Sequence, residues 1–124
     1  MARVLVVDDD VNARLLLRTL LAHLGHDVFE AADGRQGLAT AFEVEPHLII
    51  IDLSMPEMNG PTFVRALRAN ARIGTTPVAL YTASAIDAPT RDFMEIYGVA
   101  TALPKPAEPR ELLAAIEAAL EQRH

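Results

Sequence analysis

Two short runs of apolar residues, 4–7 and 48–51, contain no polar side chain. A strand with one face in water alternates apolar and polar residues, so an unbroken apolar run indicates a strand covered on both faces. Such strands belong to parallel sheets, because the helices that connect parallel strands pack on both sides. The sequence therefore predicts an α/β fold with a doubly wound, five-stranded parallel sheet. The predicted strands are residues 4–7, 27–31, 48–51, 78–81 and 100–103.

Five helical patterns alternate with these strands, as expected for successive βα units. Gly25 and Gly98 are suited to end the first and fourth helices, whereas Pro61, Pro89 and Pro109 are suited to start the third, fourth and fifth. The second helix is expected over residues 34–42. The apolar residues of the second, third and fifth helices are expected to face inward. The residues that define all five patterns are Leu17, Leu20, Leu21 and Leu24 in the first, Leu38, Ala41 and Phe42 in the second, Phe63, Val64 and Leu67 in the third, Phe93, Ile96 and Tyr97 in the fourth, and Leu112, Leu113, Ile116 and Leu120 in the fifth.

Length and composition exclude several classes of protein. The 124 residues are enough for one core, so residues 1–124 are expected to form a single domain, either stand-alone or cut from a longer protein. A net charge of −6 disfavours direct binding of nucleic acid, which requires a basic face. No apolar stretch reaches the roughly 18 residues of a membrane span, and the absence of cysteine excludes disulfides. We expect a cytoplasmic protein without direct contact with nucleic acid or membrane.

Polar residues follow the predicted strands at the points where the strands end. Asp8 and Asp9 end the first strand, Asp52 ends the third, Thr82 ends the fourth and Lys105 follows the fifth. The carboxyl ends of parallel strands share one edge of the sheet, and ligands bind outside that edge where the strand order switches. Four separate segments therefore deliver carboxylates, a hydroxyl and an ammonium to one place.

Each of these residues also has a purely structural interpretation. Aspartates before a helix often cap it, which we favour for Asp10 but not for the pair before it. Asp52 precedes a segment rich in turn residues, and threonine is common in strands, which leaves Thr82 the most ambiguous of the set. Lys105 is the only lysine among eleven basic residues, so a merely solvated loop position is disfavoured.

The chemistry of this set indicates a phosphoryl group. Neighbouring carboxylates raise one another's pKa unless a cation neutralises them, and Mg²⁺ prefers such hard oxygen ligands. A lysine offers a compact charge without the planar fork of a guanidinium, which suits a small and dense anion. We therefore expect Mg²⁺-dependent phosphoryl transfer to an aspartate.

Four stretches of the chain resemble the receiver domain of two-component response regulators. They are VLVVDDD at 4–10, IIDLSMPEMNG at 50–60, YTAS at 81–84 and KP at 105–106, and their order and spacing carry the resemblance. The resemblance extends over essentially the whole chain. It implies the flavodoxin-like receiver fold and a role in a phosphorelay.

The resemblance also implies a role for each site residue. Asp52 would be the phosphoacceptor and would bind Mg²⁺ directly together with Asp9. The backbone carbonyl of Ser54 would supply a third protein ligand, and Asp8 would act through water. Thr82 would donate its hydroxyl to the phosphoryl group.

The remaining implications concern Lys105, the donor and the output. Lys105 would contribute its ammonium, aimed by a cis peptide bond to Pro106. The donor would be a phosphohistidine on a sensor histidine kinase or a histidine phosphotransfer protein. Phosphorylation would switch the surface near the fourth helix, fifth strand and fifth helix for an output partner that the sequence does not identify, a homodimer being one arrangement it allows. Autophosphorylation and slow dephosphorylation would be the only reactions, so no enzyme with an external substrate is implied.

Two residues depart from the family pattern, and two others occupy positions that affect hydrolysis in the family. Ala102 stands three positions before the lysine, where receivers usually carry an aromatic residue that acts as a rotamer switch. Ala107 stands where a phenylalanine is common. Ser54 and Ser84 occupy the two positions that in the family influence how an attacking water is aligned, and both side chains are short.

Two other functions compete with this interpretation. A phosphatase of the haloacid dehalogenase type would need a second acid two residues after its nucleophile, where this chain has Ser54, and space for a cap domain. A pseudo-receiver that only binds partners would generally lack one of the site residues, and none is missing here.

Overall fold

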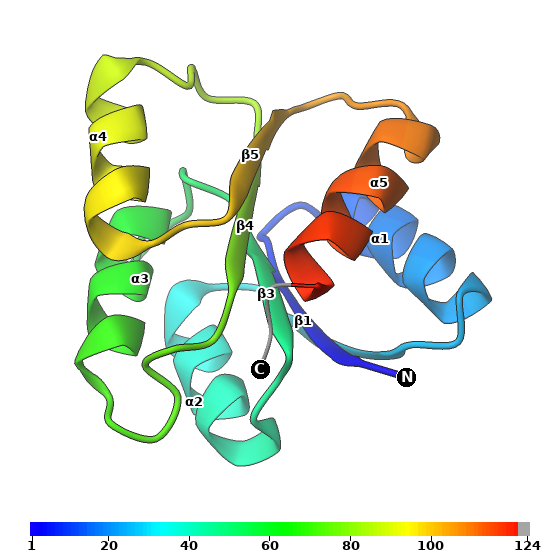
Figure 1. The fold of residues 1–124 in the computed structure, drawn as a ribbon, viewed down its shortest axis with the longest axis horizontal. Helices are drawn as coiled ribbons and strands as arrows, with labels where there is room; N and C mark the ends of the chain where they lie inside the picture. The colour runs from blue at the N-terminus through cyan, green and yellow to red at the C-terminus, as the bar shows by residue number, and fades with distance from the viewer. Residues whose placement is uncertain (122–124) are drawn as a thin grey trace.

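The computed structural model describes residues 1–121, which form one parallel sheet with helices on both faces (Figure 1). In the sequence the last helical pattern runs on to Gln122, a residue that lies outside the described part of the chain. The sheet has five strands in the order β2-β1-β3-β4-β5, so the predicted fold class is confirmed. The elements are β1 (Arg3–Val7), α1 (Val11–His23), β2 (Asp27–Ala31), α2 (Gly34–Val44), β3 (Leu48–Ile51), α3 (Gly60–Ala69), β4 (Val78–Thr82), α4 (Ala88–Tyr97), β5 (Thr101–Pro104) and α5 (Pro109–Leu120).

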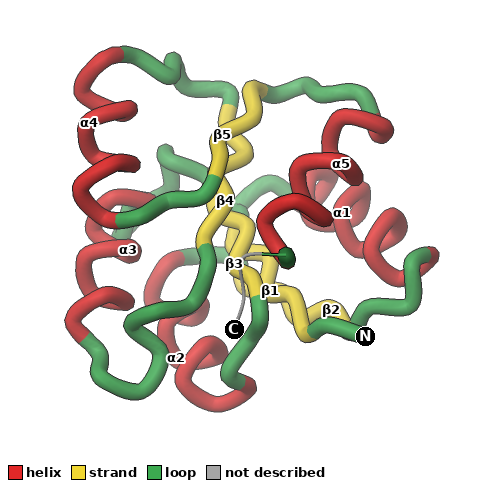
Figure 2. Tube along the Cα trace, in the orientation of Figure 1, coloured by secondary structure: helices red, strands yellow, loops and turns green. Residues whose placement is uncertain are grey.

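The two unbroken apolar runs form the central strands. β1 lies between β2 and β3, and all four residues of β3 are buried. Successive side chains of β1 enter opposite layers of the core: Val4 and Val6 pack towards α1 and α5, whereas Leu5 and Val7 pack towards α2 and α3. Figure 2 shows the strands between the two groups of helices. The strand order reverses between β1 and β3, which places the switch point beside the ends of these strands.

Helix boundaries follow local chemistry. The side chains of Asp10, Asp33, Asn59 and Asp87 accept hydrogen bonds from backbone N–H groups in the first turns of α1, α2, α3 and α4. These contacts satisfy donors that have no partner within the helix, and they confirm the capping role predicted for Asp10. Gly98 ends α4 with a φ of 66°, in the left-handed region that glycine adopts without strain.

Three apolar residues of the predicted helical patterns are exposed, and for one of them, Phe42, this contradicts the prediction. Phe42 was expected inward, but it is 47% exposed, and Ile96 is 75% exposed. In α2 the small residues Gly37 and Ala41 lie against the sheet. Phe42 directly follows Ala41, and successive residues of a helix are rotated by about 100° around its axis, so Phe42 is turned away from the sheet. The Phe42 ring instead lies 4.7 Å from the guanidinium of Arg72. Leu24 is also exposed, because α1 ends at His23.

Strand boundaries differ slightly from the prediction at the carboxyl edge. β4 extends through Thr82, and β5 covers Thr101–Pro104 rather than 100–103. Thr82 pairs with Pro104, so the last residue of β4 and the residue before Lys105 lie side by side. No helix of the described residues has both the length and the apolar character of a membrane span.

Candidate functional site

The predicted charged residues converge at the carboxyl edge of the sheet. Lys105 Nζ lies 2.7 Å from Asp8 Oδ2 and 3.1 Å from Asp52 Oδ2. Asp8 is 2% exposed and Asp52 is 7% exposed, so both carboxylates are largely removed from water. Buried charges require paired partners, and one ammonium serves both carboxylates here.

A third carboxylate completes the cluster. One oxygen from each of Asp8, Asp9 and Asp52 lies within 4.8 Å of the others, and Asp9 is exposed. All three donors are hard oxygens, and a cation such as Mg²⁺ accepts a few carboxylates while it keeps waters in its remaining positions. The donor set therefore fits Mg²⁺, with access from solvent on the side of Asp9.

Backbone groups hold the two buried carboxylates in place. The N–H of Asp10 donates to Asp8 Oδ1 at 2.9 Å, and the N–H of Ser54 donates to Asp52 Oδ1 at 3.3 Å. Each carboxylate thus has one oxygen fixed by its own loop and the other directed at Lys105. This division orients both groups before any ligand arrives.

The site shifts the pKa values of its charged groups. Burial raises the pKa of the Asp8 carboxyl above its ordinary value, although the hydrogen bond from Lys105 opposes this effect. Burial alone would lower the pKa of Lys105, but the hydrogen bond and charge of Asp8, followed by those of Asp52, raise it overall. Lys105 is therefore held as an ammonium, the form that attracts an anion.

Thr82 stands at the same edge but is not bonded to the acids. Its Oγ1 accepts a hydrogen bond from the N–H of Ser84 at 3.1 Å, and the residue is fully buried. Within residues 1–121, no hydrogen bond joins its hydroxyl to Asp8, Asp52 or the ammonium of Lys105. The Thr82 carbonyl accepts from the Lys105 N–H at 2.8 Å, which ties the two loops together.

The loops around the site require particular backbone geometry. The peptide bond between Lys105 and Pro106 is cis, as the resemblance implied. Gly60 lies so close to the loop after β3 that an added Cβ would be 2.6 Å from the carbonyl oxygen of Asp52. A side chain at position 60 would therefore displace the segment that carries Asp52.

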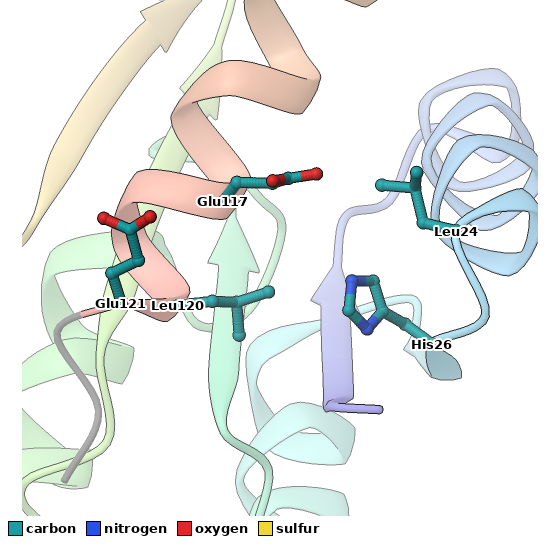
Figure 3. A pocket seen from close by; sticks show the side chains of 5 residues that line it. All are labelled: Leu24, His26, Glu117, Leu120 and Glu121. Atoms are coloured by element: carbon teal, nitrogen blue, oxygen red, sulfur yellow. The ribbon is translucent and has the colours of Figure 1, made fainter.

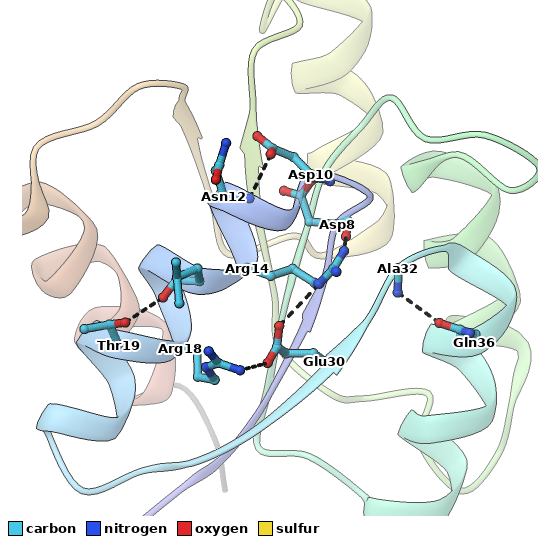
Figure 4. Close-up of polar contacts among 10 residues, drawn as sticks. Asp8, Asp10, Asn12, Arg14, Arg18, Thr19, Glu30, Ala32 and Gln36 are labelled. Atoms are coloured by element: carbon cyan, nitrogen blue, oxygen red, sulfur yellow. Dashed lines mark hydrogen bonds and ion pairs between the residues drawn. The ribbon is translucent and has the colours of Figure 1, made fainter.

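Two residues that were not predicted from the sequence also contact this set. Arg14 Nη1 donates to the carbonyl of Asp8 at 2.7 Å, and its Nε pairs with Glu30 at 3.3 Å (Figure 4). The ring centroid of Tyr81 lies 5.4 Å from Lys105 Nζ. Two features of the sequence could have indicated these contacts. Arg14 lies one turn into α1, close to the aspartates that end β1, and Tyr81 directly precedes Thr82.

Two pockets lie on the face of the sheet that α1 and α5 cover, at opposite ends of the strands. A pocket of about 460 Å³ between the ends of α1 and α5 is lined by Leu24, His26, Glu117, Leu120 and Glu121 (Figure 3). It lies at the amino edge of the sheet, away from the carboxylates. A second pocket, of about 410 Å³, adjoins the site and includes Lys105, Pro106 and Tyr81 in its lining.

Comparison with known proteins agrees with this geometry. The response regulator receiver domain family matches residues 4–117. A protein of Rhizobium etli named "Probable chemotaxis protein CheY" is 37% identical, over 94% of this chain and 90% of its own length. The solved structure of chemotaxis protein CheY4 from Vibrio cholerae superposes with a TM-score of 0.89 at 34% identity, covering 96% of this chain and 98% of that one.

Longer relatives also match. The DNA-binding dual master transcriptional regulator RpaA of Synechocystis is 36% identical over 97% of this chain, but the match covers 49% of RpaA. This chain thus spans about half the length of the transcriptional regulators it matches. It belongs to the family of response regulator receiver domains, which are signalling proteins of two-component systems rather than classical enzymes.

Proposed function

We propose that this domain accepts a phosphoryl group on Asp52 from a phosphohistidine of a sensor kinase or phosphotransfer protein, in a Mg²⁺-dependent reaction. The observation that carries the proposal is the single ammonium of Lys105 bound to both Asp8 and Asp52, beside a third carboxylate. Burial of two acids with one cation, beside a third acid, contributes little to stability, so this arrangement at an edge open to solvent favours a ligand site.

The transfer exchanges one bond for another at phosphorus. An oxygen of the Asp52 carboxylate forms a bond to phosphorus, and the bond from phosphorus to the donor's imidazole nitrogen breaks. The electron pair of the broken bond stays on that nitrogen. Lys105 offsets the repulsion between the carboxylate and the anionic phosphoryl group, and catalysis consists mainly of positioning and charge stabilisation.

The residues that would hold Mg²⁺ are Asp9, Asp52 and the backbone carbonyl of Ser54, with Asp8 acting through water. When bound, the ion supplies positive charge next to the phosphoryl oxygens. Asp8 and Asp52 are already oriented by backbone N–H groups, so these carboxylates need little rearrangement when the ion binds.

The effect of phosphorylation would be transmitted through Thr82 and the helix that follows it. An aspartyl phosphate carries about two charges and three acceptor oxygens, which can draw the Thr82 hydroxyl inward. No residue of α4 is fully buried, so this helix shares less apolar surface with the core than its neighbours. We propose that phosphorylation shifts the population of conformations of the surface formed by α4, β5 and α5. With Ala102 on β5 in place of an aromatic, the change would pass through the β4–α4 loop.

The wider context of the domain is part of the proposal. We propose that residues 1–124 act as one receiver unit. An output partner, a homodimer and cytoplasmic localisation remain predictions. The absence of direct nucleic-acid contact also remains a prediction, since the DNA-binding relatives extend well beyond the matched region.

The decisive experiment is phosphorylation by acetyl phosphate with Mg²⁺, followed by intact mass and peptide mapping. We expect stable labelling by one phosphoryl group, and loss of the label in Asp52→Asn, which removes the nucleophile but keeps its shape. Asp10→Asn is the matched control, because an asparagine at that position would still cap α1 and its side chain lies outside the proposed site. Continuous turnover of phosphodonor would indicate a phosphatase, and an absence of label would indicate a binding-only module.

The lifetime of the phosphoryl group tests the role of Ser54. Hydrolysis needs a water aligned opposite the leaving carboxylate, and the short exposed side chain of Ser54 holds such a water poorly. We expect Ser54→Asn to shorten the lifetime several-fold, whereas Ser54→Ala should stay close to the wild type. Loss of label after removal of the phosphodonor measures both. An Asn variant with an equal or longer lifetime contradicts this account.

A further inference from the structure

The aromatic ring of Tyr81 lies beside the ammonium that the proposed reaction depends on. Tyr81 is the penultimate residue of β4, directly before Thr82, and it is 4% exposed. Its ring centroid is 5.4 Å from Lys105 Nζ, within the distance over which a cation is attracted to the face of a ring. Strand pairing places Tyr81 opposite Leu103, two residues before Lys105, so the sheet itself fixes this contact.

The partners of Lys105 in the unphosphorylated site cannot all persist. Its ammonium bonds to Asp8 at 2.7 Å and to Asp52 at 3.1 Å. When Asp52 carries a phosphoryl group, the ammonium has to turn part of its hydrogen bonding to a phosphoryl oxygen. The attraction to a ring face depends little on the direction of any one N–H bond, so it can act on Lys105 both before and after this exchange.

The position of the ring relative to solvent strengthens this contact. Tyr81 and Lys105 both line the pocket beside the site, together with Ala13, Ala83 and Pro106. The lysine side chain is only 14% exposed. Attraction between a cation and a ring is stronger where both are shielded from water.

We propose that Tyr81 is a positioning residue that holds the Lys105 ammonium over the site while its carboxylate contacts exchange for a phosphoryl oxygen. The inference rests on the proposed function and adds to it a residue that acts through Lys105. The ring, rather than the hydroxyl, performs this role. A phenylalanine at position 81 should therefore preserve this role, and an aliphatic residue of similar volume should not.

The test compares Tyr81→Phe and Tyr81→Leu with the wild type. Beryllofluoride, which mimics the phosphoryl group, is titrated in the presence of Mg²⁺, and Mg²⁺ alone is titrated separately. We expect Tyr81→Leu to weaken beryllofluoride binding by about fivefold while Mg²⁺ affinity changes less than about twofold. Tyr81→Phe should restore most of the lost affinity. Ile116→Val, in the same core layer, controls for a general loss of packing. If the Leu variant does not fold, Tyr81→Met takes its place.

A double-mutant cycle isolates the contact itself. Unfolding free energies of the wild type, Tyr81→Leu, Lys105→Met and the double variant, measured without metal, should show a favourable coupling between the two residues. Additive effects overturn the inference, as does equal beryllofluoride affinity in the wild type and Tyr81→Leu. A wild type that binds no beryllofluoride overturns the proposed function, and the inference with it. The two failures are therefore distinguishable.

Discussion

Asp9→Ala should remove most of the stabilisation that Mg²⁺ gives to the wild type. A ligand that binds only the folded state stabilises it by about 2.7 kcal/mol at a hundred times its dissociation constant. Asp9 is exposed and contributes one of three carboxylates that lie within 4.8 Å of one another. Its removal should therefore weaken Mg²⁺ binding by about tenfold or more with little effect on the metal-free fold.

The measurement is a series of urea or thermal unfolding curves over a range of MgCl₂ concentrations. Asp10→Asn provides the matched control, since it also removes one negative charge from the same loop and keeps the cap of α1. That control should shift with Mg²⁺ like the wild type. Equal shifts in the wild type and Asp9→Ala would rule out the proposed metal site.

Lys105→Arg should impair phosphorylation far more than its retained charge suggests. The ammonium fits between Asp8 Oδ2 at 2.7 Å and Asp52 Oδ2 at 3.1 Å, with the ring of Tyr81 on a further side. A guanidinium is wider, and its donors lie in one plane, so it cannot take the same place among these groups. We expect phosphorylation to slow by about tenfold to a hundredfold.

The rate of labelling by acetyl phosphate measures this effect, and Mg²⁺ titration serves as its control. Mg²⁺ affinity should remain near that of the wild type, because Lys105 supplies no metal ligand. A Lys105→Arg variant that labels at the wild-type rate would show that charge alone, and not the compact shape of lysine, matters at this position.

The order and type of the elements were predictable from the sequence. Apolar runs such as 48–51 report burial on both faces, and caps such as Asp10 and Gly98 mark helix ends through local backbone chemistry. Because consecutive parallel strands share a direction, residues at their carboxyl ends meet at one edge. That rule was enough to predict that Asp8, Asp52 and Lys105 would come together.

Other features depend on how the elements pack, and a local pattern does not contain that information. The rotation of α2 over Gly37 and Ala41 turned Phe42 outward, although its sequence spacing suited either side. The partial burial of α4 likewise follows from its position against α3, which its own apolar pattern does not report.

The sequence by itself determined which chemical groups reach the carboxyl edge, because short-range patterns mark where each strand ends and parallel strands share one direction. Only the tertiary structure decided which atoms touch there. Lys105 meets Asp8 across 97 positions of the chain and Asp52 across 53, and the contacts of Arg14 and Tyr81 depend on the same long-range register. Distances of this kind are set by the pairing of strands and the packing of helices against them, which no single segment encodes.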